Sequence, residues 1–288
     1  MTSDGPRRHR ARKRFGQHFL EPVWAAKLVS AIDPRPDDVF LEIGPGHGVL
    51  TRPLAARAQA VIAYEIDRDL AAELSESAPS NVRVVEGDFL EAQPTGASRA
   101  AGNLPYNVAS PILFKLVDLY SAGLALRDAT VMLQREVADR LLAVPGTKEY
   151  GVLTVLIRHN AEVTRLLNLP AGAFRPPPKV QSTVVSLRFH PPDPPVRSVD
   201  VFRRLVQAVF TRRRKTLANA LRAFTDADSG STPVLLWSYS GPSRSRTRVG
   251  PEYALERAGI DGRRRPETLT VAEFARLADV FANLRQKT

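Results

Sequence analysis

The fold is decided by one stretch, Val39-Phe40-Leu41-Glu42-Ile43-Gly44-Pro45-Gly46-His47-Gly48. Its first half is apolar apart from Glu42 and has the length of a buried strand. Its second half carries glycine at every other position, and a helix is expected directly after it, over Leu50–Arg57. A glycine-rich turn between strand and helix lets the backbone pass close to a ligand. The stretch therefore predicts the first strand–turn–helix unit of an α/β fold.

Strands and helices alternate along the chain around this unit. Further strands are expected at Ala60–Tyr64, Val82–Glu86, Arg99–Gly102, Ala129–Gln134, Leu153–His159 and Val180–Phe189. Helices are expected at Pro22–Ile32, Arg68–Glu76, Ile112–Tyr120 and Glu136–Ala143. Such alternation is typical of parallel strands joined by crossover helices. We predict a Rossmann-like, doubly wound and mostly parallel sheet.

A proline-rich linker, His190-Pro191-Pro192-Asp193-Pro194-Pro195, divides the chain, because prolines at that density break both helix and strand. We expect the sheet domain over residues 15–192 and a small all-α domain over residues 193–288. In the small domain, periodicity predicts helices at Val201–Phe224 and Val271–Leu284, with a loop insertion at Asp226–Pro251 between them. Residues 1–14, rich in arginine, are expected to form a flexible basic arm.

The overall charge points to an anionic partner. The formal net charge is +11, and clustered Lys and Arg gain free energy by releasing counterions from phosphates. Membrane headgroups are the competing anion, but no apolar run approaches the ~20 residues that a bilayer requires, so we expect a cytosolic protein. With no cysteine and five scattered histidines, we expect no metal.

A cofactor site is indicated where successive strands end. Gly44 and Gly46 supply the turn, which alone would also suit NAD. Glu65 ends the second strand, where its carboxylate can accept both hydroxyl protons of a ribose, and Asp88 follows the third, where it can accept from an adenine amine. Glu42, placed before the turn, would repel a pyrophosphate and attract a cation. These groups favour S-adenosylmethionine over NAD.

A second site is indicated after the fourth strand by Asn103-Leu104-Pro105-Tyr106. This run offers a side-chain amide oxygen, main-chain carbonyls fixed by a proline, and an aromatic face. The N6 amine of adenine is a poor nucleophile, because its lone pair is delocalised into the ring. Acceptors aimed at its N–H protons would turn that lone pair toward a methyl group, while Tyr106 stacks on the base. Catalysis is then mainly positioning, with no strong general base.

As a set, the motifs resemble the rRNA adenine N6-methyltransferases, and most closely the small-subunit rRNA adenine N6,N6-dimethyltransferases. The blocks that carry the likeness are Arg12-Lys13-Arg14-Phe15-Gly16-Gln17-His18-Phe19-Leu20, Glu42-Ile43-Gly44-Pro45-Gly46, Glu65-Ile66-Asp67, Gly87-Asp88, Asn103-Leu104-Pro105-Tyr106-Asn107, Leu133-Gln134-Arg135-Glu136-Val137, Phe174-Arg175-Pro176-Pro177-Pro178-Lys179-Val180 and Arg213-Arg214-Lys215-Thr216-Leu217.

The resemblance implies further residue roles and a substrate. His18 and Leu20 would touch the cofactor at the mouth of its pocket, and Phe174 would close over the target adenine opposite Tyr106. Before three prolines, Phe174 is expected to be a rigid, exposed aromatic, although a loop anchor packed in the core is the other interpretation. The implied substrate is a pair of adjacent adenines in a 16S rRNA hairpin loop, each dimethylated at N6 during ribosome assembly.

Two basic clusters are candidates for binding that RNA, namely Arg12, Lys13 and Arg14 in the arm and Arg212, Arg213, Arg214 and Lys215 in the small domain. On a helix, the second cluster would form a positive face for phosphates. We expect a monomer. Two alternatives stay open: an antibiotic-resistance methyltransferase acting on large-subunit rRNA, and a non-enzymatic nucleic-acid-binding descendant of the fold.

Overall fold

The computed structural model describes residues 18–227 and 250–285. Two compact units are present, Met1–Leu142 with Ala161–His190, and Ala143–Asn160 with Pro191–Thr288. Residues 143–160 thus group with the small unit, although we expected them in the sheet domain. The basic arm with Arg12, Lys13 and Arg14, and residues 228–249 of the expected insertion, lie outside the described residues. Within the described part, no helix is long and apolar enough to cross a membrane.

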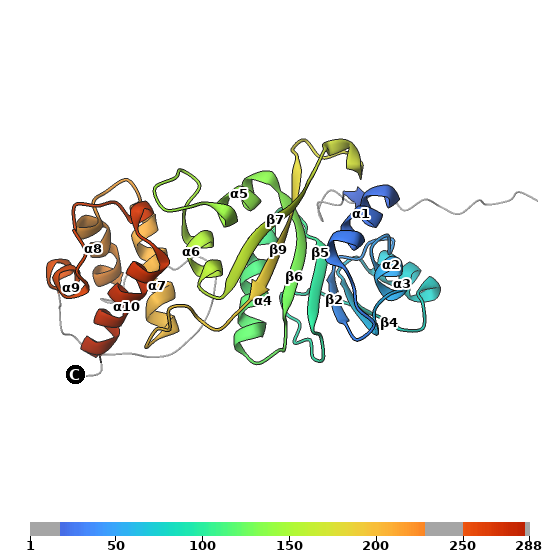
Figure 1. Cartoon of the computed structure of the whole chain (residues 1–288), viewed down its shortest axis with the longest axis horizontal. Helices are drawn as coiled ribbons and strands as arrows, with labels where there is room; N and C mark the ends of the chain where they lie inside the picture. Colours follow the sequence, from blue (N-terminus) through green and yellow to red (C-terminus); the bar gives the residue numbers. More distant parts are fainter. Residues whose placement is uncertain (1–17, 228–249, 286–288) are drawn as a thin grey trace, which may run out of the picture. The chain divides into compact units, whose positions relative to one another are not determined.

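The first unit is built on a seven-stranded sheet of order β4-β3-β2-β5-β6-β9-β7 (Figure 1). The strands are β2 Val39–Ile43, β3 Ala60–Glu65, β4 Val82–Glu86, β5 Arg99–Asn103, β6 Asp128–Gln134, β7 Ala161–Leu169 and β9 Ser182–Phe189. Neighbours from β4 to β6 pair in parallel, whereas β9 runs antiparallel to both β6 and β7. The expected doubly wound, mostly parallel sheet is confirmed.

The chain order reverses on either side of β2, which lies between β3 and β5. In sheets of this kind, ligands bind at such a switch point, beyond the carboxyl ends of the strands. The helices of this unit are α1 Pro22–Ile32, α2 Thr51–Ala55, α3 Arg68–Ser77, α4 Ala109–Ser121 and α5 Arg135–Leu142. A two-stranded ribbon joins β1 Phe19–Leu20 to β8 Phe174–Arg175, which follows the short turn η2 Ala171–Ala173.

One face of the sheet packs on α1 and α2. Leu28 and Leu54 from these helices join Phe40 and Val61 of the central strands in a single buried cluster. Burial of large aliphatic and aromatic side chains is the main favourable term in folding, at roughly 25 cal/mol per Å² of apolar surface. This packing fixes β2 and β3, and with them the residues at their carboxyl ends.

The expected strand over Leu153–His159 is wrong. The segment forms helix α6, Val152–Arg158, which begins where the Gly151 N–H donates to Thr154 Oγ1 at 3.1 Å. A short, mostly apolar run such as this one shows no clear period, so it fits a buried helix as well as a buried strand. The strand lies just beyond it as β7, where buried Ala161 and Val163 alternate with exposed residues.

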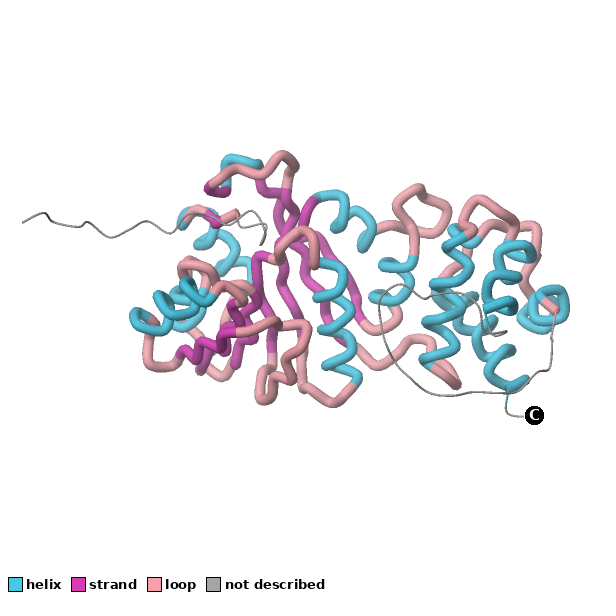
Figure 2. Tube along the Cα trace, turned by 180° about the vertical axis from the view of Figure 1, so that it is seen from behind, coloured by secondary structure: helices cyan, strands magenta, loops and turns pink. Residues whose placement is uncertain are grey.

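The described residues of the second unit form helices joined by loops, with no strand among them (Figure 2). Besides α6 it contains α7 Val199–Thr211, α8 Leu217–Ala227, α9 Pro251–Ala258, η3 Pro266–Thr268 and α10 Val271–Arg285. The expected single helix over Val201–Phe224 is therefore two helices. The break is stabilised by tertiary hydrogen bonds, since Leu217 N–H donates to the Arg264 carbonyl at 2.6 Å and Ala218 N–H to the Gly262 carbonyl at 3.0 Å. No glycine or proline marks it in the sequence.

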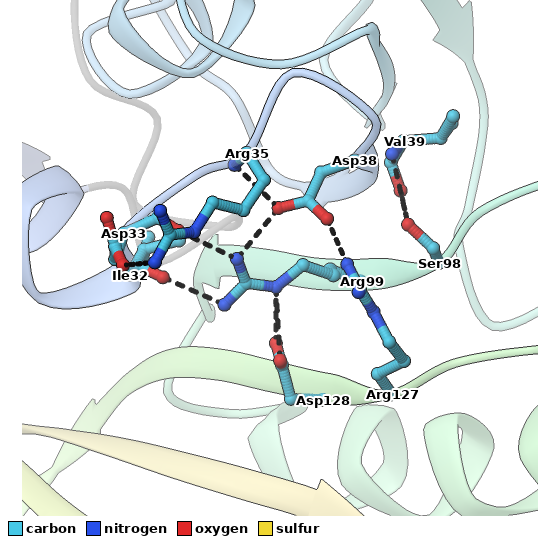
Figure 3. Close-up of polar contacts among 9 residues, drawn as sticks. All are labelled: Ile32, Asp33, Arg35, Asp38, Val39, Ser98, Arg99, Arg127 and Asp128. Atoms are coloured by element: carbon cyan, nitrogen blue, oxygen red, sulfur yellow. Dashed lines mark hydrogen bonds and ion pairs between the residues drawn. The ribbon is translucent and has the colours of Figure 1, made fainter.

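An ion-pair network ties together the strand ends opposite the switch point. Figure 3 shows the Asp38 carboxylate between the guanidinium groups of Arg99 and Arg127, with Arg99 also bound to Asp128 at 2.9 Å. Arg99 donates further to the Ile32 carbonyl at the end of α1. Burial raises the pKa of Asp38, but the Arg35 main-chain N–H and the two arginines outweigh it, so this pKa lies below its usual value. The network locks the starts of β2, β5 and β6 to α1.

Candidate active site

The glycine turn after β2 has the geometry that the sequence implies. Gly44 and Gly46 have φ of 69° and 56°, in the left-handed region that favours glycine. A Cβ at Gly46 would lie 3.2 Å from the Phe19 ring, so the turn also leaves room for β1. The Gly44 N–H donates to the Tyr64 carbonyl at 2.9 Å, which holds the turn against the end of β3.

Glu65 supports this turn from β3. Its Oε2 accepts from the Gly46 N–H at 3.0 Å, and its Oε1 accepts from the Asp67 N–H at 2.9 Å. Burial raises the pKa of Glu65, although these main-chain N–H groups oppose the rise. Each carboxylate oxygen has two lone pairs, so both can still accept from a ligand while they hold the backbone.

Glu42 is a buried carboxyl beside the turn with an oxygen that has no partner among the described residues. Its side chain is 1% exposed, and the oxygen without a hydrogen-bond partner is Oε2. Burial raises the pKa of Glu42 to about 8, with some opposition from Thr51 and a further rise caused by Glu65. Below about pH 8 the carboxyl of Glu42 is therefore mostly neutral in the ligand-free site, and a cation bound beside it would favour its ionised form.

A single pocket collects the cofactor residues expected from the sequence. Its lining includes His18, Leu20, Glu42, Gly44, Gly46, Glu65, Asp88, Asn103, Leu104, Pro105 and Tyr106. No lysine or arginine is among the lining residues, whereas three carboxylates are. The pocket thus fits a ligand with ribose hydroxyls and a positive centre better than one with phosphates. In the described residues, no cluster of histidines and carboxylates could hold a metal ion.

The Asn103–Tyr106 run lies at the end of β5, on the rim of the same pocket. Asn103 Nδ2 donates to the His18 carbonyl at 2.7 Å, and Leu104, 1% exposed, anchors the run in the core. The Pro105 carbonyl accepts from the Val108 N–H at 3.1 Å, which closes a tight turn.

Tyr106 is anchored by a residue that sequence reasoning missed. Its hydroxyl lies 2.8 Å from Ser182 Oγ at the start of β9, and burial raises the Tyr106 pKa despite this contact. Ser182 is distant in sequence and belongs to no recognisable motif, so only the sheet pairing reveals it.

Phe174 does not occupy the place expected of it. Its side chain is 0% exposed and belongs to the cluster under α1, and it is absent from the pocket lining. The reason is the β1–β8 ribbon, in which Phe174 pairs with Leu20. The expectation of an exposed aromatic is wrong, and the core-anchor interpretation describes this structure. The ring that lies beside Tyr106 is His18, with centroids 5.5 Å apart.

The second basic cluster lies in the turn between α7 and α8, not on a helical face. Arg212, Arg214 and Lys215 are exposed there. Arg213 is partly buried, donates to the Thr147 carbonyl at 2.9 Å and lies 3.8 Å from Glu267. Arg213 therefore has a structural contact that its neighbours in the cluster do not share.

A pocket that offers acceptors to a ribose and a cation, with an amide and a tyrosine beside them, fits the S-adenosylmethionine-dependent methyltransferases that act on an exocyclic amine. A family model for ribosomal RNA adenine dimethylase matches residues 8–231. A ribosomal RNA small subunit methyltransferase A from Acinetobacter baylyi is 42% identical over 94% of this chain and 92% of its own length.

Two solved structures support the same family assignment. A dimethyladenosine transferase from Plasmodium falciparum aligns with a TM-score of 0.75 at 27% identity, covering 93% of this chain and 98% of that one. The 23S rRNA methyltransferase ErmE aligns with a TM-score of 0.63 at 27% identity, covering 92% and 99%. The chain belongs to the ribosomal RNA adenine dimethylase family, and its methyl donor is S-adenosylmethionine. It is an rRNA-modifying enzyme, which excludes NAD oxidoreduction and a non-enzymatic role.

Proposed function

We propose that this enzyme dimethylates N6 of two adjacent adenines in a hairpin loop of 16S rRNA, in the assembling small ribosomal subunit, and that it does so as a cytoplasmic monomer. The observation that carries the proposal is the 42% identity, over nearly the whole chain, to a relative named for the small subunit. Unpaired loop bases can be turned into a pocket at low cost, which suits the site.

The cofactor half of the pocket is assigned to residues at the ends of β2, β3 and β4. Glu65 accepts from the ribose, Asp88 accepts from the adenine amine of the cofactor, and Gly44 and Gly46 let the backbone approach. Glu42 faces the positive end of the ligand. His18 and Leu20 close the mouth of the pocket, which they line.

The target half is assigned to Asn103, Leu104, Pro105 and Tyr106. The Asn103 side-chain oxygen and the Leu104 carbonyl accept from the two N–H bonds of the adenine N6, and Tyr106 stacks on the base. When bound, the cofactor supplies an electrophilic methyl group on sulfur. The amine lone pair forms the new N–C bond, the S–C bond electrons stay with sulfur, and the amine then loses a proton to water.

The alternative is activity on large-subunit rRNA, to which the weaker likeness to ErmE points; the small-subunit relatives favour the first activity over it. One experiment distinguishes the small-subunit activity from the large-subunit activity. The enzyme is incubated with labelled cofactor and with undermethylated small subunits, large subunits or naked RNA, and the modified base is then mapped. We expect label on two adjacent adenines of the small-subunit RNA. Label confined to the large subunit would overturn the assignment.

The basic turn is expected to contribute electrostatic affinity for RNA. Replacing Arg212, Arg214 and Lys215 with alanine removes three exposed charges and leaves the Arg213 contacts in place. Each lost phosphate contact lowers the slope of log affinity against log salt by ~0.7–0.9, so the triple variant should lose about 2 in slope. Filter binding over a range of salt concentrations measures this slope. The single variant Arg214→Ala is compared with Arg83→Ala, a control change at an exposed arginine of β4. An unchanged slope in the triple variant contradicts the RNA role.

A further inference from the structure

His18 makes contacts with three separate parts of the target site. Its main-chain carbonyl accepts from Asn103 Nδ2 at 2.7 Å. Its ring lies against the Tyr106 ring, with centroids 5.5 Å apart and planes 28° apart. Its Nδ1 lies 2.8 Å from the Pro176 carbonyl oxygen. One residue of the N-terminal segment thus joins the end of β5, the aromatic of the target site and the loop after β8.

The chemistry of these partners fixes hydrogen positions. A carbonyl oxygen only accepts, so His18 Nδ1 carries the proton toward Pro176, and the atom of the Asn103 carboxamide that faces His18 is the nitrogen. The Asn103 oxygen therefore points the other way. If the carboxamide turned over, it would present N–H groups to an amine that is itself a donor.

We propose that His18 is a positioning residue that sets the orientation of the Asn103 carboxamide, so that its oxygen and not its nitrogen meets the target amine. The ring acts at a distance, because its contacts with Pro176 and Tyr106 hold the main-chain carbonyl that receives Asn103. This role differs from cofactor contact at the pocket mouth. It rests on the proposed function of Asn103 as the acceptor for the amine.

Three variants divide the contacts of the ring. His18→Asn keeps an N–H near the position of Nδ1 and loses the ring, His18→Phe keeps the ring and loses the donor, and His18→Ala loses both. Misplacement of about 1 Å can cost ~10²-fold in rate. At saturating cofactor, we expect His18→Ala to slow single-turnover methyl transfer by about that factor, with partial recovery in His18→Asn and His18→Phe. Val23→Ala, a change at an exposed residue of α1, is the matched control.

A double-mutant cycle with Asn103→Ala tests whether His18 acts through Asn103. Residues that act through one contact show non-additive effects. We expect His18→Ala to change the rate by less than about twofold when Asn103 is already alanine. Losses that multiply in the double variant, or a normal rate in His18→Ala alone, would overturn the proposal.

A spectroscopic readout is independent of turnover and of the identity of the RNA. In protein labelled with ¹⁵N-asparagine, the Asn103 side-chain resonances are assigned by their loss in Asn103→Ala. In the wild type, the Asn103 Nδ2 proton that is donated to the His18 carbonyl should differ in chemical shift from the other Nδ2 proton and should exchange slowly with solvent. Both features should disappear in His18→Ala. Their persistence there contradicts the inference, whereas failure of the small-subunit assignment leaves this result untouched.

Discussion

Glu42→Gln is expected to stabilise the ligand-free enzyme against unfolding at pH 8, although it removes a group from the cofactor pocket. Burial raises the pKa of Glu42 from 4.5 to about 8 in the folded protein. In the unfolded chain, this carboxyl ionises freely above pH 4.5. Deprotonation therefore favours the unfolded state over the whole interval between the two values.

The way in which the free energy of unfolding changes with pH follows from the difference between the folded and unfolded pKa values of Glu42. The contribution of neutral Glu42 to stability is fully present below pH 4.5 and is lost as the pH rises toward 8. Glutamine does not titrate, so the stability of the variant relative to the wild type should grow by about 3 kcal/mol between pH 5 and pH 8. At roughly 2–4 °C per kcal/mol, its Tm should rise relative to the wild type by about 6–12 °C over that interval.

Thermal unfolding of both proteins at several pH values measures the effect. Glu86→Gln, a change at an exposed glutamate that ends β4, is the matched control and should show no such trend. Glu42→Gln should also bind S-adenosylmethionine more weakly, while its affinity for the demethylated product, whose sulfur carries no charge, should change much less. A stability difference that stays constant from pH 5 to pH 8 would contradict the assigned burial of an ionisable Glu42.

The elements that line the candidate cofactor pocket could be predicted because each depends on local chemistry. A glycine at positive φ is needed wherever the chain turns sharply beside a ligand, so Gly44 and Gly46 identify the turn without tertiary information. Glu65 ends β3 and Asp88 follows β4, and parallel strands bring their carboxyl ends to one edge. The pocket lining shows these residues together.

Other features depend on contacts between distant segments and could not be predicted from the local sequence. Phe174 precedes a run of prolines, which suggested an exposed ring, but its burial is caused by pairing with Leu20 more than 150 positions earlier. The break between α7 and α8 likewise follows from hydrogen bonds to Arg264 and Gly262. The strand expected over Leu153–His159 was wrong for another reason, since a short, mostly apolar segment shows no clear period and fits a helix as well as a strand.

Glu65→Ala and Tyr106→Ala are expected to separate cofactor binding from methyl transfer. Glu65 does two things at once, since its carboxylate accepts from the Gly46 and Asp67 N–H groups and faces the pocket. Alanine leaves those amides without their acceptor, at a cost of ~1–3 kcal/mol for each buried group, and removes the acceptors for the ribose. We expect affinity for S-adenosylmethionine to fall by about 10²-fold or more. Glu65→Gln, which restores one acceptor, should bind with intermediate affinity.

Tyr106 contributes on the other side of the pocket, where its ring is held by Ser182 and His18. Loss of a stacked base costs ~1–3 kcal/mol, and loss of alignment adds to it, so Tyr106→Ala should slow methyl transfer by about 10²-fold or more while cofactor affinity changes little. Tyr106→Phe keeps the ring and loses only the Ser182 contact, so its rate should fall far less. Calorimetric titration with S-adenosylmethionine and labelled methyl transfer measure the two quantities separately. If Tyr106→Ala loses cofactor affinity as severely as Glu65→Ala, Tyr106 belongs to the cofactor site, and the stacking platform for the target adenine must be sought on another ring.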